Sequence, residues 1–351
     1  MILFIFVMTL LILGLFRLKN WHRHILRKRD LRARYYRRQA RVDIKKGIKE
    51  LIDSGKLIDR GSDAPIRYVG TFGSTEPDVI FFYTAGVHGN EYFAIQSLIR
   101  KIASIDVNEL VQTGIQVVCV PIVNQWGFEN CRRTTKNRVD LVRNSSYRSQ
   151  RRDVPSYPLV RGWKSWWIKT FICPLFGQTW YYMGHELEPE LIELDKIVDP
   201  ILHSNCDIWA FDFHTGNNRA KTTIWRHDLD QREYVPNYLR RVLLKEDISF
   251  GKIDYAIDGG IHEYFHLRYQ EIQAKKGISE KNRKTLNAFT FELAVLDDAS
   301  NAKYRDQYFN GSVFEPHPKE RETKLEREVK KLSVLFEAVK KRMQLKRKTA
   351  Y

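Results

Sequence analysis

The middle of the chain contains short, nearly continuous apolar runs, which span residues 78–83, 115–123, 207–213 and 288–295. They lack the strict alternation of apolar and polar residues that marks a strand with one solvent-exposed face. Such runs are typical of strands covered on both faces. Stretches with helical spacing lie between them, for example at 91–105 and 189–202. This alternation predicts a single three-layer α/β/α domain over residues 46–318, built on a mixed, largely parallel central sheet.

The first 16 residues, MILFIFVMTLLILGLF, are apolar apart from Thr9 and contain no charge. As a helix they would measure about 24 Å, and Leu18 with the long side chains of Arg17 and Lys19 extends this towards the roughly 30 Å of a bilayer core. The basic residues follow the apolar run and no small-residue cleavage site is present, so the pattern favours an uncleaved anchor over a cleaved signal peptide. We therefore predict a transmembrane anchor helix over residues 1–18, which makes the protein single-pass with its domain in the cytoplasm.

The positive charge of the chain is concentrated at its two ends. There are 59 Lys and Arg against 42 Asp and Glu, a formal net charge of +17. Residues 17–38 hold ten basic residues and one acid, and residues 340–351 hold six basic residues and no acid, so the remainder is nearly neutral. Because an enzyme of nucleic acids places its positive field on the folded domain, this distribution argues against nucleic acid as a partner. We predict a basic juxtamembrane arm over residues 19–45; an interfacial helix or an RNA-binding arm is the alternative.

The carboxyl-terminal part, residues 319–351, is predicted to be an amphipathic helix that ends in a basic tail. Apolar residues recur at steps of three and four from Leu325 to Met343, which indicates a helix packed on the domain. An aromatic-rich insertion at 156–183 lies between two predicted strands. The four cysteines form no Cys-x-x-Cys pair, which excludes a disulfide scaffold and a thiolate zinc finger.

A candidate metal site begins where the first apolar run ends. His88 and Glu91 stand three residues apart in a glycine-flanked turn between a predicted strand and a predicted helix. The same His-x-x-Glu spacing begins at His185 and at His317, so the spacing alone has little weight. Only His88 directly follows a buried strand, and open α/β sheets bind their ligands at the carboxyl ends of strands.

Two further candidates belong to later strands. His214 comes directly after the run at 207–213, and two imidazoles with one carboxylate are a ligand set that zinc uses in hydrolases. Glu292 lies inside the apolar run AFTFELAV, where burying a charge is costly. An acid at such a position is either ion-paired for structure or placed for proton transfer, and its apolar neighbours favour proton transfer.

Four motifs occur together in one order: GVHGNE at 86–91, NQWGFENCRRTTKNRVDLVRN at 124–144, DFHTG at 212–216 and TFE at 290–292. With these motifs the chain resembles the zinc metallocarboxypeptidase superfamily, near its succinylglutamate desuccinylase and aspartoacylase branches. The resemblance implies one zinc ion per chain, bound by His88, Glu91 and His214. It also implies a zinc-dependent hydrolase that cleaves an amide bond.

The same resemblance implies roles for residues around the zinc. Glu292 would be the general base for the attacking water. Arg133 would polarise the scissile carbonyl, with its neighbour Arg132 as the alternative. Asp140 would accept a hydrogen bond from His88 and so orient that imidazole towards the metal.

On the substrate side the chain departs from the family pattern. Arg143 would bind a substrate carboxylate, but the asparagine that normally assists it is Val142, and Asn144 is the nearest substitute. The family's catalytic tyrosine has several candidates upstream of the base, namely Tyr255, Tyr264 and Tyr269. The implied substrate is a peptide or an N-acyl amino acid that bears a carboxylate. The alternative, favoured by Val142, is a catalytically inactive binding module of the same fold, tethered to the membrane.

Overall fold

The computed structural model describes residues 37–145, 186–215, 222–226, 237–246, 248–250, 261–276, 286–294, 316 and 319–349. The chain divides into two compact units, Met1–Asp43 and Ile44–Tyr351, and the fold below is that of the second unit. The predicted anchor at 1–18 and the aromatic-rich insertion at 156–183 lie outside the described residues. Within the described ranges no helix is both long and apolar enough to cross a bilayer, and the anchor stays a prediction.

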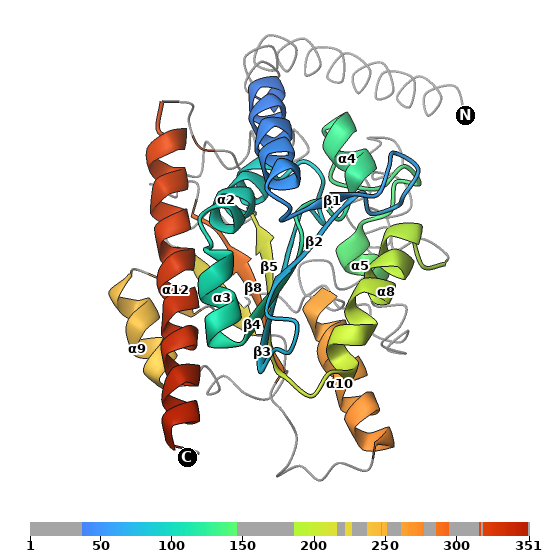
Figure 1. The fold of residues 1–351 in the computed structure, drawn as a ribbon. Coiled ribbons are helices and arrows are strands. Elements are labelled where there is room, and N and C mark those ends of the chain that lie inside the picture. Colours follow the sequence, from blue (N-terminus) through green and yellow to red (C-terminus); the bar gives the residue numbers. More distant parts are fainter. Residues whose placement is uncertain are drawn as a thin grey trace, which may run out of the picture. The chain divides into compact units, whose positions relative to one another are not determined.

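The centre of the domain is a mixed sheet, which in the described part of the chain has eight strands in the order β1-β2-β4-β3-β5-β8-β6-β7 (Figure 1). The strands are β1 (Ile58–Asp59), β2 (Tyr68–Gly73), β3 (Val79–Ala85), β4 (Ile115–Val120), β5 (Asp207–His214), β6 (Thr223–Arg226), β7 (Ser249–Phe250) and β8 (Leu286–Glu292). The four central strands β4, β3, β5 and β8 pair in parallel, as do β6 and β7. β2 pairs antiparallel with β1 and β4, and β6 pairs antiparallel with β8. The predicted mixed α/β domain is confirmed, and each predicted apolar run forms one of the four central strands.

Helices lie on both sides of the sheet, with α2, α3, α9 and α12 on one side and α8 and α10 on the other (Figure 1). The helices are α2 (Tyr92–Ala103), α3 (Val107–Thr113), α4 (Gln125–Asn130), α5 (Leu141–Asn144), α8 (Pro189–His203), α9 (Asn237–Lys245), α10 (Ile261–Lys275) and α12 (Arg321–Thr349). The part of a further helix that belongs to this unit, residues 44–53, precedes β1. Their ends follow local chemistry: Asp106 caps α3 by accepting a hydrogen bond from the Asn108 nitrogen, and α8 begins with a proline.

Ring contacts of β3 identify which helices cover each face of the sheet. The ring of Phe81 lies 4.7 Å from that of Phe336 in α12, and the ring of Phe82 lies 5.7 Å from that of Phe265 in α10. Because successive strand residues point to opposite faces, the sheet has an α12 face and an α10 face. By strand register, the α10 face includes at the carboxyl ends of the central strands Thr84, Asp212, His214 and Glu292.

Glu190, in the first turn of α8, makes stability depend on pH. Burial, assisted by the charge of Glu188, raises the pKa of the Glu190 carboxyl to about 7. The folded state therefore keeps a proton that the unfolded chain loses from about pH 4.5 upwards, so the contribution of this carboxyl to stability falls as pH rises from about 4.5 to 7. We expect the stability gained by Glu190→Gln to be larger at pH 8 than at pH 5 by about 1–2 kcal/mol.

Urea unfolding of the wild type and of Glu190→Gln at both pH values measures this difference. Glu186→Gln is the matched control, because the side chain of Glu186 is exposed just before the same helix. A stability difference between wild type and Glu190→Gln that is the same at pH 5 and pH 8 would contradict the prediction.

Candidate metal centre

The turn between β3 and α2 holds two of the predicted metal ligands. Gly86 adopts a left-handed φ of +63° there. Gly89 packs so closely against α4 that a Cβ at this position would lie 2.2 Å from the Phe128 nitrogen. A side chain at either glycine would widen this turn, so both are needed for His88 and Glu91 to face each other.

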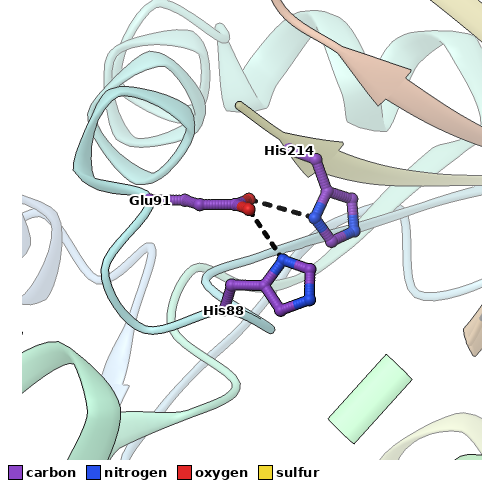
Figure 2. A group of neighbouring side chains, drawn as sticks. All are labelled: His88, Glu91 and His214. Atoms are coloured by element: carbon purple, nitrogen blue, oxygen red, sulfur yellow. Dashed lines mark hydrogen bonds and ion pairs between the residues drawn. The ribbon is translucent and has the colours of Figure 1, made fainter. Parts of the chain in front are cut away.

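The structure brings His88, Glu91 and His214 together at the carboxyl ends of β3 and β5 (Figure 2). The Nδ1 atom of His88 lies 2.7 Å from one carboxylate oxygen of Glu91, and the Nδ1 atom of His214 lies 3.0 Å from the other. One ligand atom from each of the three residues lies within 4.8 Å of the others. All three side chains are buried. This convergence of two imidazole nitrogens and a carboxylate fits the donor set of a zinc site.

The electrostatics of the cluster suit a cation. Burial alone would raise the pKa of Glu91, but the charges of His88 and His214 and their hydrogen bonds hold this pKa well below its usual range. Burial would lower the pKa of His214, but the charges of Asp212 and Glu91 hold it well above its usual range. The carboxylates therefore create a negative potential at the imidazoles, which favours a proton or a metal ion there.

A buried carboxylate stands behind each imidazole. Asp212 lies 2.7 Å from the Nε2 atom of His214, and it accepts a second hydrogen bond of 2.8 Å from the Thr84 hydroxyl. Asp140 lies 3.4 Å from the Nε2 atom of His88, and this atom makes no hydrogen bond within the described part of the chain. The sequence motifs predict no role for Asp212, although it precedes His214 by two residues on the same strand and therefore shares its face.

We expect Asp212→Asn to weaken zinc binding about 10- to 100-fold, because the carboxylate fixes the orientation and basicity of His214. The affinity is measured by competition with a chromophoric chelator. Asp207→Asn, at the other end of β5 and on the opposite face, is the matched control. Equal affinities of Asp212→Asn and wild type would show that the carboxylate has no such role.

The predicted oxyanion-binding arginine lies beside the candidate metal ligands. The Nε atom of Arg133 donates a 3.0 Å hydrogen bond to Asp140, and its Nη1 atom lies 3.8 Å from a carboxylate oxygen of Glu91. Its side chain is 19% exposed. The side chain of Arg132, the alternative, is exposed. Of the two, Arg133 is therefore the guanidinium within reach of the cluster.

Hydrogen bonds connect the loop that contains Arg133 and Asp140 to the start of α8. Glu188 accepts a 2.8 Å hydrogen bond from the Thr135 hydroxyl. Asn144 is fully buried: its Nδ2 atom donates to the Glu186 carbonyl at 2.7 Å, and its Oδ1 atom accepts from the Glu188 nitrogen at 2.8 Å. The side-chain amide of Asn144 thus connects this loop to the start of α8. Its predicted contact with a substrate stays a prediction.

The other predicted substrate-side residues are placed only in part. Arg143 lies in α5, but its side chain is outside the described ones. Val142 is buried in the core beneath the α10 face, as is Tyr269, a tyrosine candidate of the sequence analysis. Tyr255 and the side chain of Tyr264 lie outside the described part, so the tyrosine is not assigned.

Glu292 is the last residue of β8 and is in register with His214 of β5. In-register residues of parallel neighbours point to the same face, so Glu292 and His214 share the α10 face. The side chain of Glu292 is half-buried, whereas the metal-ligand candidates are buried. The strand ends therefore place this carboxylate next to the cluster, on the same side of the sheet.

Among solved structures, this chain is similar to carboxypeptidase A from Helicoverpa armigera, with a TM-score of 0.52 and 13% identity over 85% of this chain and 71% of that one. The chain has the carboxypeptidase fold. The fold explains how residues more than 100 positions apart meet, because the parallel strands β3, β5 and β8 all end at one edge of the sheet.

Other solved structures are similar to this carboxypeptidase-fold chain at lower scores. The metallo-carboxypeptidase from Burkholderia cenocepacia has a TM-score of 0.45 and 13% identity over 81% of this chain. This chain spans only 64% of the length of that carboxypeptidase. The murein-tripeptide amidase MpaA from Escherichia coli O157 has a TM-score of 0.38 and 17% identity over 71% of this chain and 86% of that one. A family model described as a protein of unknown function, DUF2817, matches residues 68–161. No curated protein matches the sequence.

Proposed function

We propose that this protein is a zinc-dependent hydrolase that cleaves an amide bond in a peptide or an N-acyl amino acid. The observation that carries the proposal is the convergence of His88, Glu91 and His214 at a strand edge that also holds Glu292. Buried clusters of two imidazoles and a carboxylate are the ligand set of catalytic zinc sites that keep a position for water. A zinc ion bound there would act as a Lewis acid and make a water molecule more acidic.

The residues of the chain then have separate tasks in the proposed reaction. Glu292 takes a proton from the attacking water, whose oxygen bonds to the carbonyl carbon. As the carbon–nitrogen bond breaks, Glu292 passes that proton to the leaving amine. Arg133 donates to the developing oxyanion, and Asp140 and Asp212 keep the two imidazoles in place. In this proposal Arg143 binds a carboxylate of the substrate.

The proposed location of the enzyme is the cytoplasmic side of a membrane. Residues 1–18 would anchor the chain, and the basic arm at 19–45 would lie against the lipid headgroups. The support is the uncharged apolar run followed directly by basic residues.

The proposal is tested with full-length protein that has been stripped by a chelator and then titrated with zinc. Release of free amine is measured on a panel of short peptides and N-acyl amino acids. We expect activity to return with about one zinc per chain. Zinc binding without hydrolysis of any panel member would favour the alternative of an inactive binding module, which Val142 supports because it replaces a carboxylate-binding asparagine.

A further inference from the structure

α12 buries polar side chains against the sheet. Glu328 and Lys331 are 0% and 5% exposed, and the facing Thr222, directly before β6, is 0% exposed. The Nζ atom of Lys331 lies 3.0 Å from Glu328 and 3.1 Å from the Thr222 hydroxyl. The Thr222 hydroxyl in turn donates to Glu328. These three side chains are called the α12 cluster below.

The α12 cluster holds the chain just beyond Glu292. The Ala294 nitrogen donates a 3.3 Å hydrogen bond to the Thr222 hydroxyl, and Arg327 of α12 reaches the Ala294 carbonyl at 3.5 Å. Between Glu292 and Ala294, the Leu293 nitrogen donates a hydrogen bond to the His214 carbonyl at 2.9 Å. The backbone that follows Glu292 is therefore attached both to α12 and to the strand of a metal-ligand candidate.

Strand register divides the neighbouring side chains between the two faces. Thr223 of β6 pairs with Glu292 of β8, so both point to the face of the candidate metal centre. Thr222, one residue earlier, points to the opposite face, where it meets α12. The Thr222 hydroxyl thus ties the residue before β6 to Ala294, just beyond the end of β8, on the face opposite the candidate metal centre.

We infer that the α12 cluster is a positioning device that sets where the carboxylate of Glu292 stands relative to the metal centre. The inference rests on the proposed function of Glu292 as general base. The residues of the α12 cluster are positioning residues, because they act on Glu292 through the backbone that directly follows β8. Displacing a catalytic group by about 1 Å is enough to cost up to about 100-fold in rate.

The chemistry of the cluster fits positioning better than stabilisation. A buried ion pair loses much of its attraction to the cost of removing both charges from water, and apolar residues of similar volume often stabilise a protein as well or better. The Thr222 hydroxyl makes one donated and two accepted hydrogen bonds, so its place is fixed from three directions. A directional contact of this kind determines the position of a backbone, which an apolar contact does less well.

The test uses the full-length, zinc-loaded protein and replaces the hydroxyl with a methyl group in Thr222→Val. We expect kcat to fall about 10-fold, while KM and the zinc content stay within about twofold of wild type. Thr222→Ser, which keeps the hydroxyl, is expected to restore most of kcat. Ser333→Ala is the matched control: its hydroxyl lies on the same helix but meets Lys101 of α2 at 3.2 Å.

Amide hydrogen exchange of residues 286–293 provides a readout that needs no substrate. These residues exclude Ala294, whose hydrogen bond the substitution removes directly. We expect exchange about fivefold faster in Thr222→Val than in wild type, with α2 unchanged. A double variant, Glu328→Leu with Lys331→Met, removes both charges together and is expected to give the same result if Thr222→Val does not fold.

Each outcome separates the two proposals. Loss of activity in Glu292→Gln with wild-type kcat and exchange in Thr222→Val would overturn the positioning role alone. Unchanged activity in Glu292→Gln would overturn the proposed function instead. If the wild type hydrolyses no member of the panel, amide exchange of residues 286–293 decides. Equal exchange rates in Thr222→Val and wild type would then show that the α12 cluster does not position this segment.

Discussion

Replacing His88 with alanine is expected to remove the bound zinc and to lower amide hydrolysis at least about 1000-fold. The imidazole supplies one of three protein donors, and its Nδ1 atom lies 2.7 Å from Glu91, the central residue of the cluster. Two remaining donors hold zinc weakly, because structural and catalytic sites use at least three protein ligands. Metal analysis of the purified variant, together with release of amine from the best substrate, measures both effects.

His203→Ala is the control for this experiment. His203 ends α8, is exposed, and bonds through its ring only to the Asp199 carbonyl among the contacts of the described residues. The control should keep its zinc and its rate. A His88→Ala protein that still binds one zinc with wild-type affinity would mean that the ion is held elsewhere, and the proposed centre would have to be abandoned.

Glu292→Gln is expected to lower kcat about 100- to 10000-fold while the zinc content stays at the wild-type level. Glutamine has nearly the shape of glutamate but cannot accept a proton at neutral pH. The ligand atoms of the cluster come from other residues, so the metal should remain. The rate under saturating substrate and the zinc content of the same sample give the result.

The same substitution separates the two explanations for an acid in an apolar strand. If Glu292 serves only structure, glutamine lowers the free energy of unfolding and leaves the rate nearly intact. If it transfers protons, the rate falls and stability changes little. Glu271→Gln, on the exposed side of α10, controls for the loss of one negative charge.

The interior of the sheet was predictable from sequence because its strands are covered on both faces. The runs that begin at Asp78 and Asp207 appear as β3 and β5, and their ends place His88 and His214 side by side. Parallel order alone then brings distant residues to one edge. The predicted ligand candidates follow from this simple rule rather than from their spacing in sequence.

The edges of the sheet were not predictable. β1 and β7 have two residues each in the structure, and β2 contains two glycines, so none shows an apolar run. Their conformation depends on pairing with a neighbour that is distant in the chain, which local pattern cannot reveal. For the same reason the role of Asp212 was not predicted, because it depends on contacts with His214 and with Thr84 of another strand.

α12 also differs from its prediction in an instructive way. The amphipathic pattern indicates the apolar side correctly, since Leu325, Leu332 and Phe336 are buried. The helix continues to Thr349, so most of the predicted basic tail is helical. The burial of Lys331 and Glu328 could not be read from a pattern that classes both as polar, because it depends on Thr222, which is more than 100 residues away in the chain.

The ligand candidates are unevenly distributed along the chain, and this has a consequence for folding. His88 and Glu91 are close neighbours, whereas His214 meets Glu91 across 123 residues. An ion held by all three would join these distant positions only in the folded state, because the unfolded chain does not bring the three donors together, so its binding free energy would add to the stability of the fold. Zinc would then stabilise the fold of the domain as well as take part in the reaction, and the ion-free chain would be cleaved faster by proteases.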